Sequence, residues 1–294
     1  MKIVLAENFR TVFYTPFYAA YAGGEFAKQG IDIQFVESPT PGSAITQMYE
    51  GHVNLVWGGP LRAIKLRDEN IHEEKALYAF GEVVGKDPFF IVSAKSMPDF
   101  SLKDLEGSRF GVVNEVPTPW LCLQEDLRDH GVDMTKIQVS DSRTMPENLE
   151  ALRNGELDFI QVFEPFVTLA EMSSGHVVYA SASRGMTAYT TFLSTPSMIE
   201  NNREAFTTMV SVIENMRQWI NSEDPGKIAD VVKQFYPNLD KKDLETCIAR
   251  YQKIGLWTCH RVVSRDGFLR LRQSMKNSGF ITKEPAYEEC VAIL

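Results

Sequence analysis

Short apolar runs alternate with helical patterns along the first two thirds of the chain. Residues 2–6, 31–36 and 52–57 are rich in aliphatic side chains and have the length of strands. Between them, apolar residues recur at helical spacing over residues 17–30 and again over residues 42–48. Strands that alternate with helices in this way predict β-α-β units and mostly parallel sheets.

The alternation continues to residue 194 and is then replaced by helical patterns. Further strands are predicted at residues 77–84, 89–94, 109–113, 137–139, 157–163, 177–180 and 187–194. Beyond residue 196, one apolar stripe has the spacing of a buried helix face, and its members are Phe206, Met209, Val210, Ile213, Met216 and Ile220. We therefore expect an α/β protein with a helical C-terminal tail.

The stretch from residue 107 to 130 combines a short strand, a loop and a helix. Thr118 and Pro119 suit the N-cap and first residue of that helix. In open α/β sheets, ligands bind at the carboxyl ends of strands, where a helix N-terminus offers free N–H groups. Ordinary strand-to-helix turns would also explain each such stretch. Similar turns at residues 42–43 and 58–59 favour a ligand cleft, with residues 114–120 as one wall.

Length, charge and composition limit the classes of protein to which the chain can belong. The chain has 294 residues, of which 44% are hydrophobic, enough for two domains with proper cores. Its net charge of -9, with Lys and Arg scattered among acids, excludes a general nucleic-acid binder. No apolar run approaches the roughly twenty residues of a membrane span. Residues 1–10 lack the apolar core of a secretory signal. We therefore expect either a cytoplasmic protein or an exported one whose signal was removed.

The sequence contains no recognisable catalytic or metal-binding motif. The four cysteines form no CxxC pair and match no common zinc spacing, and HExxH, Walker A, GxGxxG and GxSxG are absent. We predict no metal, no cofactor and no catalytic residues, with the cysteines as buried thiols. Cys122 is the one candidate nucleophile, because a thiol near a helix N-terminus has a lowered pKa.

Six segments spread along the chain carry a family resemblance. They are PFYAAYAGGEFAKQGIDIQFVE, PGSAITQMYEGHVNLVWGGP, LKDLEGSRFGVV, ALRNGELDFIQVFEPFVTLAE, TTFLSTPSMIENNREAFTTMVSVIENMRQWI and YQKIGLWTCHRVVSRDGFLRLRQSMKNSG. In order and spacing they resemble the periplasmic solute-binding proteins for nitrate, taurine and alkanesulfonates, with the related thiamine-pyrimidine binding proteins and precursor synthases. The resemblance covers nearly the whole chain.

The resemblance implies a type 2 periplasmic-binding-protein fold with two α/β lobes and a ligand held between them. Lobe one would comprise residues 1–92 and 188–294, and lobe two residues 93–187. Two crossing strands would join the lobes near residues 89–93 and 187–194. Strands are predicted independently at both crossings.

The same resemblance implies which residues face the ligand. Lobe one would contribute Asn8, Arg10, Phe13, Tyr14, Gly42, Ser43, Gly58 and Gly59. Lobe two would contribute Asn114, Glu115, Thr118, Trp120 and Glu164. Helix-dipole stabilisation would equally explain an acid at the position of Glu164.

Aromatic residues near the predicted strand ends bear on the ligand class, and they are Phe9, Phe13, Tyr14, Trp57 and Trp120. Core packing explains each of them singly, but together they favour a flat aromatic or heteroaromatic ligand over a bare inorganic anion. Arg10 or a free helix start would hold a carboxylate or sulfonate on that ligand.

The expected function is a non-enzymatic solute-binding protein that closes over a small organic ligand. An ABC transporter permease is the candidate partner, and the location is periplasmic if a signal was removed. The alternative is a cytoplasmic enzyme on the same fold, such as a decarboxylase, a lyase or a thiamine-pyrimidine-type biosynthetic enzyme. A ligand sensor for a regulatory partner is a third reading. The chain has no adjacent cysteines and none in loop 8–16, which disfavours the synthase and the desulfinase of this group.

Overall fold

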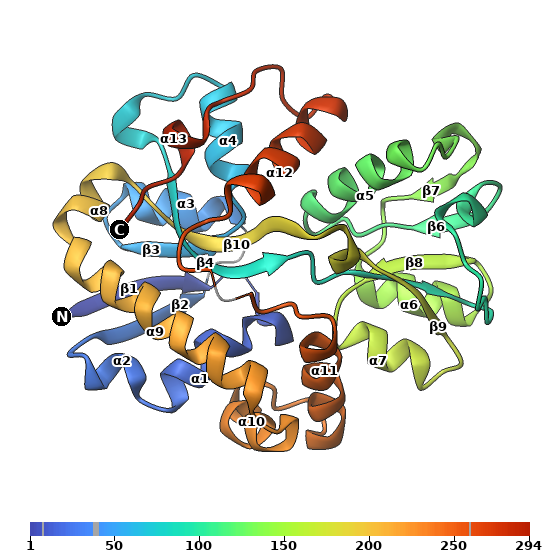
Figure 1. The fold of residues 1–294 in the computed structure, drawn as a ribbon, viewed down its shortest axis with the longest axis horizontal. Coiled ribbons are helices and arrows are strands. Elements are labelled where there is room, and N and C mark those ends of the chain that lie inside the picture. The colour runs from blue at the N-terminus through green and yellow to red at the C-terminus, as the bar shows by residue number, and fades with distance from the viewer. Residues whose placement is uncertain (8, 38–40, 259) are drawn as a thin grey trace.

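The computed structural model describes residues 1–7, 9–37, 41–258 and 260–294. Its named strands form two five-stranded sheets that lie side by side along the long axis of the molecule (Figure 1). We call the first sheet with its helices lobe one, and the second sheet with its helices lobe two. This arrangement confirms the predicted two-lobe α/β fold.

The sheet of lobe one has the strand order β2-β1-β3-β10-β4. Its strands are β1 (Lys2–Glu7), β2 (Asp32–Glu37), β3 (Leu55–Gly58), β4 (Tyr78–Lys86) and β10 (Met186–Ser194). Strand β1 pairs in parallel with β2 and β3, whereas β10 runs antiparallel to β3 and β4.

The sheet of lobe two has the order β7-β6-β8-β5-β9. Its strands are β5 (Phe90–Ser93), β6 (Arg109–Gly111), β7 (Gln138–Ser140), β8 (Phe159–Val162) and β9 (His176–Ala180). Strand β6 pairs in parallel with β7 and β8, and β5 is antiparallel to β8 and β9.

Both sheets are therefore mixed, whereas the sequence pattern predicts mostly parallel sheets. The chain passes from the first sheet to the second over residues 87–89 and returns over residues 181–185. The chain enters lobe two by β5 and re-enters lobe one by β10. Both strands start at the junction, so each runs antiparallel to the strands that end there. The exact lobe limits at residues 92 and 188 stay a prediction.

Thirteen α-helices of the described residues cover the sheets. In lobe two they are α5 (Thr118–Asp129), α6 (Met145–Arg153) and α7 (Phe166–Glu171). In lobe one they are α1 (Thr15–Ala22), α2 (Glu25–Lys28), α3 (Pro41–Tyr49), α4 (Leu61–Asp68), α8 (Pro196–Asn201), α9 (Arg203–Ser222), α10 (Pro225–Val232), α11 (Lys241–Lys253), α12 (Arg265–Asn277) and α13 (Tyr287–Cys290). Short 3-10 helices are η1 (Val12–Tyr14), η2 (Glu73–Lys75), η3 (Leu102–Leu105), η4 (Met134–Lys136), η5 (Ser181–Arg184) and η6 (Lys233–Phe235).

Two sequence predictions about helices can be compared with these bounds. The apolar stripe starting at Phe206 lies on α9, and most of its members are buried. The single helix predicted over residues 17–30 is two helices, because Gly24 between them has a φ of 68°, which glycine adopts at little cost. No helix of the described ranges is both long and apolar enough to cross a membrane.

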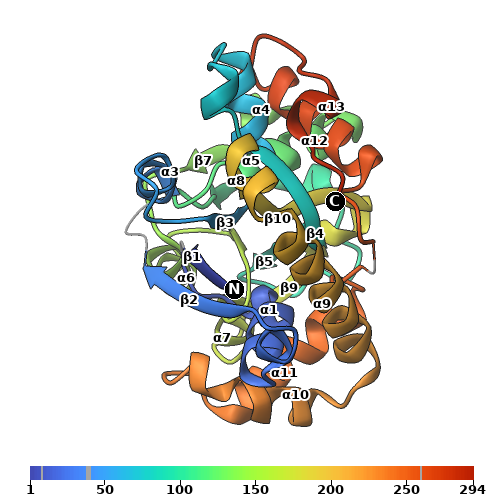
Figure 2. The same cartoon turned by 90° about the vertical axis from the view of Figure 1, so that its left-hand side faces the viewer.

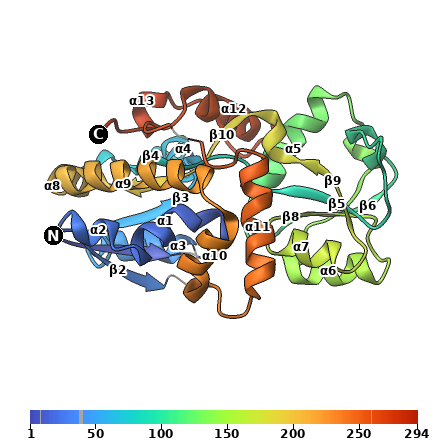
Figure 3. The same cartoon turned by 60° about the horizontal axis from the view of Figure 1, so that its bottom comes forward.

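The C-terminal tail does not form a unit of its own. Helices α8 and α9 cover lobe one, as the end-on view shows (Figure 2). Helix α11 stands between the lobes beside α7 (Figure 3), and α12 packs against α5 on another side of the junction. The tail therefore holds lobe one to lobe two at two places.

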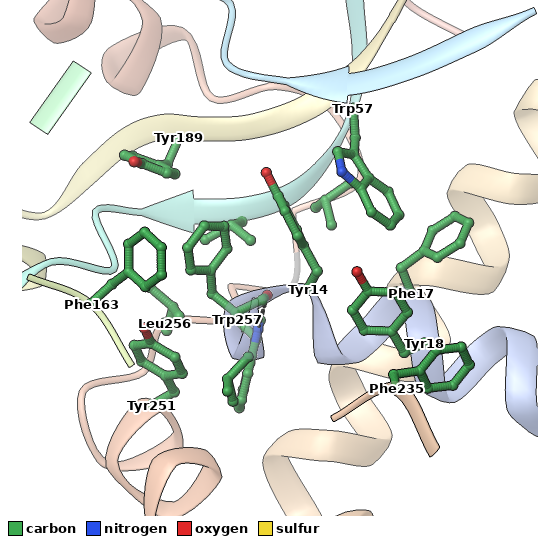
Figure 4. Close-up of a cluster of buried hydrophobic side chains, with 14 of the residues drawn as sticks. Tyr14, Phe17, Tyr18, Trp57, Phe163, Tyr189, Phe235, Tyr251, Leu256 and Trp257 are labelled. Atoms are coloured by element: carbon green, nitrogen blue, oxygen red, sulfur yellow. Dashed lines mark hydrogen bonds between the residues drawn. The ribbon is translucent and has the colours of Figure 1, made fainter. Parts of the chain in front are cut away.

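An aromatic core continues through the junction between the lobes. Phe163, which follows β8 of lobe two, packs edge-on against Phe13 of lobe one at 5.3 Å between ring centroids. It also packs against Phe89 in the first crossing at 5.0 Å. Figure 4 shows Phe163 in one cluster with Tyr14, Trp57 and Tyr189. The lobes thus share buried apolar contacts as well as their two covalent connections.

A buried ionic cluster ties the two crossings to each other. Arg184 in the return crossing pairs with Asp87 in the outgoing crossing and with Asp126 on α5. The Nε atom of Arg184 donates to both carboxylate oxygens of Asp126 at 2.9–3.0 Å, and Tyr179 donates to the same carboxylate at 3.1 Å. Burial raises the pKa of Asp87 despite the nearby guanidinium. The cluster therefore links the junction to α5, whose first residue, Thr118, lines a cavity between the lobes.

Candidate ligand-binding site

A cavity of 200 Å³ lies between the lobes. Lobe one lines it with Phe9, Tyr14, Gly58, Gly59, Leu61, Arg62, Tyr189 and Thr190, and lobe two with Glu115, Val116, Pro117 and Thr118. Three larger surface hollows, of 440, 540 and 530 Å³, are each lined by lobe one alone. We favour the interlobe cavity because the carboxyl end of β3 and the N-terminus of α5 meet there, where α/β sheets bind ligands.

Tyr14 forms the aromatic floor of the cavity. It ends η1, is 3% exposed, and stacks on Trp57 with 4.6 Å between ring centroids (Figure 4). Burial raises the pKa of its phenol, and a hydrogen bond with Thr190 and the charge of Arg62 oppose this shift only in part. At neutral pH the phenol therefore keeps its proton and can donate a hydrogen bond.

Gly58 and Gly59 connect β3 to α4 at the edge of the cavity. A Cβ atom on Gly59 would lie 2.9 Å from the carbonyl oxygen of Tyr189, and one on Gly58 would lie 3.3 Å from the side chain of Leu193. The close approach of β10 thus explains both glycines without any ligand. Gly59 therefore allows the backbone of Tyr189 to approach the turn after β3.

Arg62 is a lining residue that the sequence interpretation missed. It lies in the first turn of α4 and is half-buried, and desolvation lowers its pKa while the nearby phenol of Tyr14 opposes this shift. Among the described residues that line this cavity, it is the one arginine or lysine. Its place directly after the predicted turn at residues 58–59 was a signal that could have identified it.

The lobe-two wall consists of the residues that lead into α5. The N-cap of α5 is Pro117, with no side-chain cap, so Thr118 is the first helical residue and not the N-cap that we predicted. Glu115 is exposed at the rim, where its carboxylate accepts a hydrogen bond of 2.8 Å from the backbone of Met145. The lobe-two wall thus presents the N-terminus of α5, which has no side-chain cap, and the carboxylate of Glu115, which is held by the backbone of Met145.

Five of the thirteen predicted site residues meet at this cavity, and they are Tyr14, Gly58, Gly59, Glu115 and Thr118. Asn8 lies outside the described residues. Gly42 and Ser43 lie in the first turn of α3 and are not among the described residues that line the cavity. The binding role of the predicted residues stays a prediction.

Four other predicted residues make contacts elsewhere. Arg10 pairs with Glu7 at 2.9 Å and lies over aromatic rings of lobe one. Phe13 is fully buried in the core behind Tyr14. Asn114 donates to the backbone of residue 142 at 3.2 Å, and Trp120 packs within lobe two. None of the four lines the cavity.

Glu164 is fully buried at the contact between α7 and α11 and is held there by protein partners. Its carboxylate accepts hydrogen bonds from Arg250 at 2.6 Å, from the backbone and hydroxyl of Thr168 at 2.9 and 3.0 Å, and from the thiol of Cys247 at 3.4 Å. Glu164 therefore joins the two lobes, and we leave it out of the proposed site.

Cys122 is the cysteine that the sequence offered as a nucleophile, and its environment contradicts that role. The side chain is 1% exposed, and burial raises the pKa of its thiol to about 12. Burial likewise raises the pKa of Cys290 to about 12 and that of Cys247 still further. A thiol with so high a pKa holds almost no thiolate at neutral pH and is a poor nucleophile.

The burial of these three cysteines predicts that their thiols react slowly in the native protein. In a Cys259→Ser variant, which removes the one cysteine outside the described residues, the native protein should release almost no thionitrobenzoate from Ellman's reagent at pH 8 within minutes. After unfolding in guanidinium, three equivalents should react. Rapid release of one equivalent by the native variant would contradict the burial of these thiols.

Two α/β lobes, two crossings and a cavity walled by both lobes define the class of two-lobed periplasmic-binding-protein folds. Among the described residues there is no group of three or more His, Cys, Asp or Glu placed to hold a metal ion.

Within this class, the chain belongs to the NMT1/THI5-like family, whose model matches residues 12–225. The match confirms the resemblance seen in the sequence. The chain is 23% identical to "Putative binding protein YtlA" of Bacillus subtilis (strain 168), over 99% of this chain and 87% of that protein.

Solved structures share the fold at low sequence identity. The periplasmic aliphatic sulphonate binding protein SsuA from Escherichia coli has a TM-score of 0.78 and 14% identity, over 99% of this chain and 92% of that one. The ligand binding component of an ABC-type import system from Staphylococcus aureus has a TM-score of 0.72 and 14% identity, over 100% of this chain and 96% of that one.

Proposed function

We propose that this protein is a solute-binding protein that closes its two lobes over a small aromatic or heteroaromatic ligand carrying an anionic group. The observation that carries the proposal is the cavity walled by both lobes, in which Arg62 lies beside the hydroxyl groups of Tyr14 and Thr190. The binding functions named for YtlA and for the two solved neighbours support it.

The two halves of the proposed ligand would meet different groups of the cavity. Arg62, Tyr14 and Thr190 supply charged and neutral donors from lobe one, and the N-terminus of α5 adds partial positive charge from lobe two. Phe9 and Tyr189 supply apolar ring faces and edges. An anionic head with one flat ring satisfies both sets of contacts.

The cavity also limits the size of the ligand. Its 200 Å³ is below the range of about 300–1,000 Å³ found for pockets that hold drug-sized molecules. A single ring with one small anionic substituent is therefore the size that we propose.

We further propose that an ABC transporter permease recognises the closed form, outside the cytoplasm. The descriptions of the neighbours as periplasmic and as part of an import system support this assignment. Closure over a ligand changes the relative position of the two lobes, and such a change is what a membrane partner can read.

The experiment that tests the ligand class is a thermal-shift screen. Benzoate, benzenesulfonate, nicotinate, an aminopyrimidine, ethanesulfonate and nitrate would each be added at millimolar concentration. We expect an anionic single-ring compound to give the largest rise in melting temperature, because a ligand at 100 times its Kd stabilises the native state by about 2.7 kcal/mol.

The control compounds separate the contribution of the ring to binding from that of the negative charge. Ethanesulfonate and nitrate lack the ring, and the aminopyrimidine lacks the anion, so an equal shift with any of them would contradict that part of the proposal. A hit should be recovered chemically unchanged after long incubation. Conversion of the hit to a product would instead support an enzyme.

A further inference from the structure

Strand β10 contains a two-residue bulge where it passes the cavity. Along β10 the pairing advances four residues, from Met186 to Thr190, while along β4 it advances only two, from Lys86 to Val84. From Thr190 to Phe192 it advances two residues along β10 and four along β4, so the bulge is local and the register is restored beyond it. Bulges of this kind turn side chains away from their regular directions and are frequent beside functional sites.

Ala188 lies inside this bulge in a conformation that is unfavourable for alanine. Its φ is 49°, in the left-handed region, and its side chain is 0% exposed. The Cβ atom makes this region costly for any residue except glycine, and Asn or Asp tolerate it best. The other non-glycine residues with positive φ in the described chain, Asn70 and Ser174, are exposed polar residues in turns. Ala188 is thus an exception that requires an explanation.

The surrounding structure holds the bulge from two sides. A Cβ atom on Gly267, in the first turn of α12, would lie 2.7 Å from the backbone nitrogen of Ala188. On the other side, a Cβ atom on Gly59 would lie 2.9 Å from the carbonyl oxygen of Tyr189. The backbone of β10 is therefore packed between α12 and the turn after β3, and such packing is what maintains a strained conformation.

The bulge has a direct consequence for the cavity. In a regular strand, consecutive side chains point to opposite faces of the sheet. Tyr189 and Thr190 are consecutive, yet both line the cavity. The ring of Tyr189 also packs edge-on against Phe13 at 5.9 Å, and the side chain of Thr190 is close enough to the phenol of Tyr14 to lower its pKa. A regular β10 would remove one of these two side chains from the site.

We propose that Ala188 is a positioning residue of the ligand site, whose left-handed conformation directs both Tyr189 and Thr190 to the cavity. The ring of Tyr189 then contributes to the aromatic wall and the hydroxyl of Thr190 to the anion-binding end. This inference rests on the proposed function in so far as the cavity is the place where the ligand binds. It makes the strand that returns the chain to lobe one a part of the binding surface.

The test compares Ala188→Gly with Ala79→Gly. Ala79 lies in the neighbouring strand β4, is equally buried, and has no positive φ, so it is a matched control for the lost methyl group. We expect Ala79→Gly to lower the melting temperature by about 4 °C. Ala188→Gly should stay within about 2 °C of the unmodified protein, because relief of the left-handed conformation offsets the lost methyl group.

Two further readouts follow the backbone of the bulge and the ligand site, and the second of them, the affinity, is one that a purely structural role would leave unchanged. Hydrogen exchange followed by mass spectrometry should show the amides of residues 187–190 exchanging about tenfold faster in Ala188→Gly, since glycine has more conformational freedom there. Calorimetric titration with benzenesulfonate or benzoate should show about tenfold weaker binding. Ala79→Gly should change neither quantity.

The possible outcomes are distinct. If Ala188→Gly lowers the melting temperature as much as Ala79→Gly, the conformational argument is overturned. If exchange and affinity both match the unmodified protein, the positioning role is overturned. If the unmodified protein binds neither probe, the proposed ligand class fails, and the role of Ala188 is then decided by titrating both variants with whichever compound of the screen raises the melting temperature most.

Discussion

Replacing Arg184 by methionine should destabilise the native state by about 3–5 kcal/mol, the usual cost of removing one partner from a buried ion pair. The substitution leaves the carboxylates of Asp87 and Asp126 buried without their cation. Urea denaturation followed by circular dichroism would measure the loss. Because these groups tie both crossings to α5, we expect the loss to appear as a lower midpoint for the whole protein.

An exposed pair provides the matched control. Arg109 and Asp158 are 2.8 Å apart, with side chains 44% and 39% exposed. Arg109→Met should therefore cost less than about 1 kcal/mol. A similar effect of both substitutions would mean that the buried cluster does not stabilise the junction.

The loss in Arg184→Met should depend on pH in a defined direction. Burial already raises the pKa of Asp87, and removal of the guanidinium takes away the attraction that opposes this shift. A carboxyl group whose pKa is higher in the folded than in the unfolded state favours folding at low pH and loses that contribution as the pH rises. The variant should therefore be closer in stability to the unmodified protein at pH 5 than at pH 8.

Replacing Arg62 by methionine should weaken the binding of an anionic ring compound by between tenfold and a hundredfold. A hydrogen bond to a charged group contributes about 1.5–3 kcal/mol, and each 1.4 kcal/mol is a factor of ten in affinity. Isothermal titration calorimetry with the best anionic hit of the screen would measure the change. The effect should persist at about 0.5 M salt, because a direct contact is screened less than long-range attraction.

Arg10→Met is the control for this substitution. It removes the same charge from lobe one, but from a side chain that pairs with Glu7 and does not line the cavity. Its affinity for the hit should stay within about twofold of the unmodified protein. If Arg10→Met abolished binding and Arg62→Met did not, Arg10 would be the anion-binding residue, as predicted from the sequence, and the role proposed for Arg62 would be wrong.

The sequence predicted those features that depend on local pattern. A short apolar run located β1 and an apolar stripe at helical spacing located α9, because apolar periodicity follows directly from burial of one face. The rule that ligands bind at strand ends brought attention to Gly58, Gly59 and Thr118, and all three line the cavity. These residues lie where a strand ends or a helix begins, so their place in the fold can be inferred from neighbours in sequence.

The features that the sequence did not predict depend on contacts between distant segments. Glu164 was expected to face a ligand, but Arg250, which pairs with it, lies 86 residues further along the chain. Tyr189 and Thr190 share one wall only because β10 is bulged between α12 and the turn at Gly59. Such a bulge is imposed by packing and has no signature in an alternating apolar run.

The contact between α7 and α11 determines how the cleft can open. Separating these helices would break the buried interactions of Glu164 and would expose Phe163 with its aromatic neighbours to water. Helix α12 packs against α5 at the second contact between the lobes, so we expect the lobes to rotate about an axis that passes close to both contacts and leaves them in place. The cleft would then open at the rim where Glu115 and Pro117 are exposed. A ligand would enter past these two residues and reach Tyr14 and Arg62 last.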